Sequence, residues 1–79
     1  MARAEIFETV KKYILEQLDV NESKVVESAA MVDDLGADSA SLMMLVMDLE
    51  AEYGMTVEDD AISSIRTVGD IVDYIAKKA

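Results

Sequence analysis

Apolar residues recur three or four positions apart, the spacing of a helix face, in three separate segments of this 79-residue chain. The first segment runs from about residue 4 to 18, the second from Ser39 to Tyr53, and the third opens at Thr67. Residues 59–64 fit one further short helical turn, and the alternation typical of a half-buried strand is not sustained anywhere. The pattern predicts an all-α fold: a small four-helix bundle of three principal helices and one short helix, with a long first loop.

Each principal segment has an apolar face that we expect to form the core. In the first segment the face consists of Ile6, Val10, Tyr13 and Ile14, flanked by Phe7 and Leu18. In the second it consists of Leu42, Leu45, Val46, Leu49 and Tyr53, and in the third of Val68, Ile71, Val72 and Ile75. Residues 19–37 form an irregular stretch that is long for so small a domain, and loops of this length are often functional. We expect its apolar residues to pack onto the core; they are Val25, Val26, Met31, Val32 and Leu35.

Local signals mark the helix ends. Asp38 is a good N-cap for the second helix, and Gly54 suits the left-handed position that follows a helix. Thr67 followed three residues later by Asp70 is a variant of the capping box.

The composition excludes several kinds of chemistry. The chain has no cysteine and no histidine, so it offers no disulfide, no usual zinc site and no obvious nucleophile–base pair. Any thiol or acyl chemistry here needs a cofactor to supply the reactive group. Its length predicts one small domain, residues 1–79. Nothing in it resembles a signal peptide or a membrane span, so we expect a cytoplasmic protein.

The negative charge is concentrated in the middle of the chain. The net charge is −10, and between Asp19 and Asp60 twelve acidic residues stand against one lysine, Lys24. Such a surface repels nucleic acid and attracts basic protein patches, although solubility alone is the simpler explanation.

The second helix also has an apolar stripe opposite its core face, formed by Ala40, Met43, Met44, Met47 and Ala51. A domain of this size can bury only one face of a helix well, so we expect a partly exposed patch. Methionine suits a surface that repacks against protein partners or an acyl chain. The alternative is that the long first loop folds over this stripe and makes it part of the core.

Ser39 directly follows the predicted N-cap. Its hydroxyl is then not needed for capping and can point to solvent, at a helix N-terminus where a phosphate is favoured. Taken alone, an Asp-Ser pair at a helix start most often indicates nothing more than a cap.

The wider pattern resembles the acyl carrier protein family. "DDLGADS", then "LVMDLEAEYG" and "TVGDIVDYI", match the family's signature serine after "LGA" and the helices that follow it, and "VKKYILEQLDVNESKV" is similar to its opening segment. The resemblance implies a carrier rather than an enzyme. It implies 4′-phosphopantetheine joined to Ser39 by a separate phosphopantetheinyl transferase, with Asp38 as part of the motif.

The same resemblance implies that the cofactor's thiol holds acyl intermediates as thioesters for fatty-acid, polyketide or related biosynthesis, and that the helices can shelter the chain. It places partner docking on the second helix, against acyl-handling enzymes with basic faces. The methionine stripe adds an apolar part to the docking face that we expect of these enzymes. The residues expected at that surface are Ala40, Met43, Met44, Met47, Asp33, Asp34, Asp48 and Glu50. We expect the carrier itself to be a monomer.

Several positions depart from the family pattern: Ala40 replaces the leucine after the serine, and Met44 replaces a usually acidic residue. The residues around Met44 are also atypical, namely Ser41, Leu42 and Met43. We therefore expect a specialised carrier rather than the housekeeping one. A carrier-like module that takes no cofactor and acts only by protein binding is the alternative function.

The acidic clusters do not make a recognisable metal site. An EF-hand that starts at Asp34 needs glycine at its sixth position and glutamate at its twelfth, but the chain has Ser39 and Leu45 there. We predict no dedicated metal site, only weak divalent-ion binding that relieves carboxylate repulsion. No substrate-binding motif accompanies the paired carboxylates, which argues against acid–base catalysis.

Overall fold

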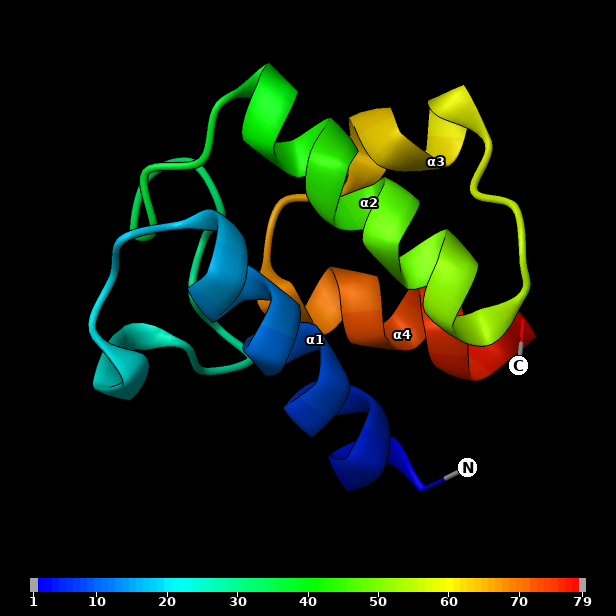
Figure 1. Ribbon diagram of the computed structural model, residues 1–79, viewed down its shortest axis with the longest axis horizontal. Helices are drawn as coiled ribbons and strands as arrows, with labels where there is room; N and C mark the ends of the chain where they lie inside the picture. Colours follow the sequence, from blue (N-terminus) through cyan, green and yellow to red (C-terminus); the bar gives the residue numbers. More distant parts are fainter. Residues whose placement is uncertain (1, 79) are drawn as a thin grey trace.

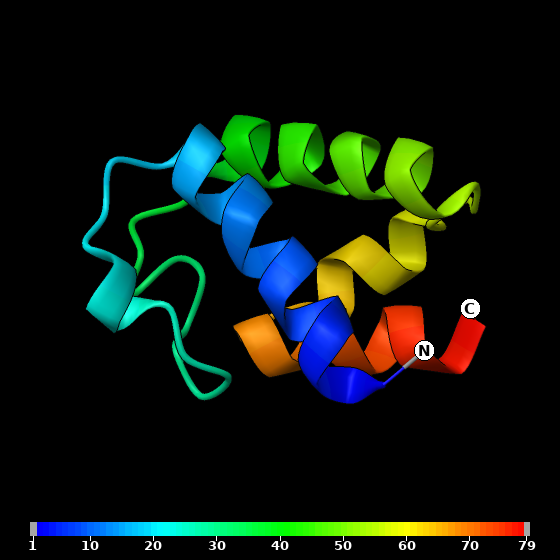
Figure 2. The ribbon, with the colours of Figure 1, turned by 60° about the horizontal axis from the view of Figure 1, so that its bottom comes forward.

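The computed structural model describes residues 2–78. Four α-helices follow one another along the chain, α1 (Arg3–Gln17), α2 (Ser39–Tyr53), α3 (Asp59–Ser64) and α4 (Val68–Lys78), with a 3₁₀ turn, η1 (Glu22–Lys24), inside the long first loop (Figure 1). Figure 2 shows α2 and α4 on opposite sides of the bundle, with α1 crossing both and α3 between them. The described residues contain no strand, only an isolated bridge between Ala30 and Thr67. The four-helix, all-α prediction is confirmed.

The core is built from the helix faces that the spacing predicts. Its buried members are Ile6, Val10 and Ile14 from α1, Leu45 and Leu49 from α2, and Val68, Ile71, Val72 and Ile75 from α4. Tyr13, Leu42 and Tyr53 are half-buried at the edges of this cluster. The first helix begins and ends one residue earlier than predicted.

The long loop contributes to the core, but less than we expected. Val25, Met31 and Leu35 are buried, whereas Val26 and Val32 are exposed, so the prediction was wrong for those two valines. Hydrogen bonds from Asp34 N to Ala30 O and from Gly36 N to Val32 O wind residues 30–36 into a turn. Met31 and Leu35, four positions apart, share its inner side, and Val32 points outward.

Backbone hydrogen bonds join this loop to the start of α4. Met31 N donates to Arg66 O (2.8 Å), Val68 N to Ala29 O (3.0 Å) and Gly69 N to Glu27 O (2.8 Å). A Cβ on Gly69 would lie 3.0 Å from the same Glu27 oxygen, so this approach favours glycine.

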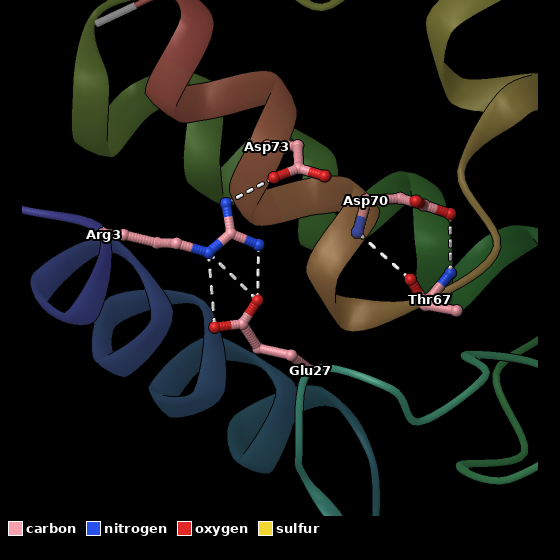
Figure 3. A network of polar contacts seen from close by, with 5 residues as sticks. All are labelled: Arg3, Glu27, Thr67, Asp70 and Asp73. Carbon is pink, nitrogen blue, oxygen red and sulfur yellow. Dashed lines mark hydrogen bonds and ion pairs between the residues drawn. The ribbon is translucent and has the colours of Figure 1, made fainter.

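Side chains reinforce the same junction (Figure 3). The Arg3 guanidinium bonds to the carboxylates of Glu27 and Asp73 and so links α1, the loop and α4. Asp70 accepts from the N–H groups of Arg66 (3.0 Å) and Thr67 (3.1 Å), and Asp70 N donates to Thr67 Oγ1 (3.1 Å). The predicted capping box at the start of α4 is therefore confirmed.

The predicted C-terminal end of α2 is also confirmed. Gly54 has φ 61° and ψ 39° and its N–H donates to Glu50 O, which is the left-handed ending expected for α2. This bond fixes the C-terminal end of α2, on which most of the candidate site residues lie.

Candidate functional site

Ser39 is the first residue of α2, and Asp38 caps that helix. Asp38 has an extended backbone (φ −109°, ψ −177°), and its Oδ1 accepts a hydrogen bond from Ser41 N at 2.8 Å. Both residues are exposed, and the Ser39 hydroxyl has no hydrogen-bond partner within residues 2–78. Because Asp38 supplies the cap, as predicted, the serine oxygen is available for covalent chemistry.

Asp38 is held in its charged form. The Ser41 backbone N–H, with a smaller contribution from the Ser41 side chain, lowers the pKa of the Asp38 carboxyl below its ordinary value. The cap is therefore ionised at neutral pH. The serine beside it lies where the N–H groups and dipole of a fifteen-residue helix favour a phosphate.

The methionine stripe on the outer face of α2 is exposed. Met43, Met44 and Met47 expose 42%, 53% and 60% of their surface, and Ala40 and Ala51 are exposed beside them. The first loop does not cover them, so the alternative of a buried stripe is wrong. This unbroken apolar face on a strongly acidic protein is typical of a surface that binds a partner.

Three of the four acidic residues expected at the partner surface bond within the protein. Asp34 Oδ2 accepts from Ala30 N (2.7 Å), Asp48 Oδ2 from Gln17 Nε2 (2.8 Å) and Glu50 Oε2 from Val57 N (2.7 Å). The fourth, Asp33, is exposed. The sequence carries no signal for these bonds, except that Asp34 and Ala30 are close enough in the chain for a turn.

Glu52 on α2 is similarly engaged. Its Oε1 accepts from the Tyr13 hydroxyl at 2.6 Å, and this bond raises the pKa of Tyr13 to about 12. Asp48 and Glu52 thus attach α2 to α1, whereas Glu50 bonds to the segment that follows α2.

A narrow apolar cavity lies between α2, α4 and the segment that joins α2 to α3. Its lining residues are Val46, Leu49, Met55, Val57, Ile65, Ile71, Tyr74 and Ile75. The cavity has a volume of about 10 Å³, close to the least that one water molecule needs. Residue spacing along the sequence identified several of these side chains as core but did not indicate a cavity.

Within residues 2–78, no three acidic side chains gather in an arrangement that would hold a metal ion. No helix in the same part of the chain is long and apolar enough to cross a membrane.

Comparison with known proteins agrees with this geometry. The family model for the phosphopantetheine attachment site matches residues 8–75, which include Ser39 and all of α2. An acyl carrier protein from Thermotoga maritima is 56% identical over 77 residues, 98% of this chain and 95% of that protein. This chain belongs to the acyl carrier protein family.

Solved structures of the family have the same fold. The acyl carrier protein from Enterococcus faecalis superposes with a TM-score of 0.83 at 38% identity, with both chains covered completely. A candidate acyl carrier protein from Mycobacterium tuberculosis gives a TM-score of 0.86 at 28% identity over 94% of this chain and 99% of that one.

Membership confirms the expected class of function. Acyl carrier proteins are carriers rather than enzymes, and the attachment-site family bears 4′-phosphopantetheine covalently on a serine. The protein is thus a carrier for biosynthesis of the fatty-acid type. An exposed serine hydroxyl at a helix N-terminus, with the cap supplied by its neighbour, fits that group.

Proposed function

We propose that Ser39 is the residue that carries 4′-phosphopantetheine and that residues 1–79 act as one carrier domain. The observation that carries this proposal is the exposed Ser39 hydroxyl, which makes no hydrogen bond within residues 2–78 and follows the Asp38 cap at the start of α2. The bound cofactor supplies a thiol on which acyl groups are held as thioesters, a nucleophile that a chain without cysteine lacks.

The residues around Ser39 have separate roles in this proposal. Asp38 keeps the first turn of α2 formed through its bond to Ser41 N, so the serine is presented in one orientation. The helix N-terminus offsets the charge of an attached phosphodiester, which nearby Asp33 and Asp34 would otherwise repel.

The partner surface has two chemical parts. Ala40, Met43, Met44 and Met47 form an exposed apolar face, and the acidic residues around α2, including Asp33, Asp34, Asp48 and Glu50, give the region its negative charge. The phosphopantetheinyl transferase and the acyl-handling enzymes would therefore present basic groups beside an apolar surface. We infer a monomeric, cytoplasmic carrier specialised for partners of this mixed kind.

Intact mass spectrometry tests the attachment site. The purified protein is incubated with coenzyme A and a broad-specificity phosphopantetheinyl transferase. We expect the mass of the wild type to rise by one phosphopantetheinyl group. Ser39→Ala should show no rise, and Ser28→Ala, which removes another exposed serine, should behave as the wild type. No rise in the wild type with any transferase would instead favour a module that acts only by protein binding.

A further inference from the structure

The apolar cavity is almost closed in this structure. Its volume of about 10 Å³ is far below the roughly 300 Å³ or more of a typical small-molecule pocket. An acyl chain can therefore enter only if one wall of the cavity moves.

The wall formed by residues 55–58 and Ile65 is held less firmly than the others. The walls on α2 and α4 contain the buried residues Val46, Leu49, Ile71 and Ile75, whereas Met55, Val57 and Ile65 are only partly buried. Residues 55–58, the wall segment, lack regular structure and contribute Met55 and Val57 to the cavity lining. Regions with few buried contacts open at the lowest free-energy cost.

Glu50 holds this wall segment through both its backbone and its side chain. Its carbonyl oxygen accepts from the N–H groups of Gly54 and Met55, the latter at 3.1 Å. Its Oε2 reaches further along the chain and accepts from Val57 N at 2.7 Å in a partly buried setting. No other side chain within residues 2–78 hydrogen-bonds to the wall segment.

We propose that the Glu50 carboxylate is a positioning group that holds Val57 against the cavity and so sets how readily an acyl chain enters. The inference rests on the proposed carrier function and extends it to the control of chain entry. It also gives Glu50 a role inside the molecule that differs from the partner contact expected from sequence.

Amide hydrogen exchange in the unmodified protein tests whether the Glu50 side chain restrains the wall segment. Glu50→Ala should speed exchange of the Val57 amide by about tenfold or more relative to amides in α1, because a charged hydrogen bond is lost. Glu50→Gln keeps an uncharged acceptor and should have a smaller effect. Asp60→Ala removes the same charge from an exposed side chain outside the wall segment and should leave the Val57 rate unchanged. An unchanged Val57 rate in Glu50→Ala would overturn the proposal.

A second measurement tests chain entry. An octanoyl-phosphopantetheine group is loaded onto Ser39, and methyl NMR of Val46 and Ile71 reports the fraction of chains in the cavity. Because opening costs less without this hydrogen bond, Glu50→Ala should raise the ratio of inserted to free chains several-fold over the wild type and Asp60→Ala. Equal ratios would overturn the control of entry. Failure to load Ser39 would count against the proposed function, while exchange at Val57 would still decide whether Glu50 holds the wall.

Discussion

Met44 and Leu45 are neighbours on α2 that experience opposite environments. Met44 is 53% exposed on the outer stripe, and Leu45 is 1% exposed in the core. The same substitution to glutamate at each position therefore separates an exposed apolar face from a buried one, with the helix and the added charge held constant.

The expected cost at Met44 is small. Methionine and glutamate have nearly equal helix propensity. A glutamate at position 44 would face Asp48 four residues on, and a like-charge pair at that spacing costs about 0.2–0.5 kcal/mol. Loss of the partly covered methionine surface adds little at so exposed a position. We expect Met44→Glu to lower stability by about 0.5 kcal/mol, which corresponds to ~2–4 °C in Tm.

The expected cost at Leu45 is several times larger. Leu45→Glu removes an apolar side chain whose burial contributes about 1.5–3 kcal/mol and places a carboxylate among apolar atoms, at a cost of several kcal/mol more. Against a total stability of about 5–15 kcal/mol, the variant should be largely unfolded.

Thermal melts followed by circular dichroism measure both variants, with Met44→Gln as the uncharged control. A collapse of the Met44→Glu transition to the level of Leu45→Glu would refute the exposed stripe. Given a folded Met44→Glu, affinity for an enzyme that contacts the methionines should fall and its salt dependence should rise, since the interface becomes more electrostatic. Unchanged affinity and salt dependence would show that Met44 lies outside the docking surface.

Three further predictions concern stability. Tyr53→Phe removes a buried hydroxyl that has no hydrogen-bond partner within residues 2–78, and should stabilise the fold by about 1 kcal/mol in urea titrations; a loss of stability would reveal an unrecognised partner. N–H groups of Thr67 and Arg66 lower the pKa of Asp70, so its stabilising effect is present above the unfolded value of about 3.9 and is lost as pH falls through the lower folded value. The Tm difference between wild type and Asp70→Asn should accordingly shrink below about pH 4, and a constant difference would contradict this. Because the protein has a net charge of −10, its Tm should rise when NaCl is added, and MgCl₂ should have the same effect at lower concentrations. A Tm that changes in neither salt would show that repulsion between the carboxylates does not lower stability.

Features decided within a few residues of sequence were predictable. The Asp38 cap, the left-handed Gly54 and the Thr67–Asp70 capping box each depend on partners no more than four positions apart. The helix faces follow from periodicity, and the exposure of the methionine stripe follows from the limited area that a small domain can cover.

Features that depend on tertiary placement were not predictable. Arg3 meets Asp73 seventy positions away, and Asp48 meets Gln17 across two helices. Exposure of Val26 and Val32 depends on how the loop turns, which apolar composition does not encode. The bond from Val57 N to Glu50 spans seven residues, but it forms only because the chain reverses after Gly54.

These intramolecular bonds limit how much the acidic side chains can contribute to binding a partner. A carboxylate already bonded to one of the protein's own donors gains less from an approaching lysine or arginine, because one of its oxygens is engaged and its geometry is fixed. Asp34, Asp48 and Glu50 are in this position, whereas Met43, Met44 and Met47 make their apolar surface directly available. The diffuse negative charge can still steer a basic partner toward α2 from a distance. On the proposed docking surface, discrimination between enzymes would then depend on the contact itself. A partner would have to bury the three methionines beside Ser39, the proposed attachment site, and a purely basic surface cannot do this.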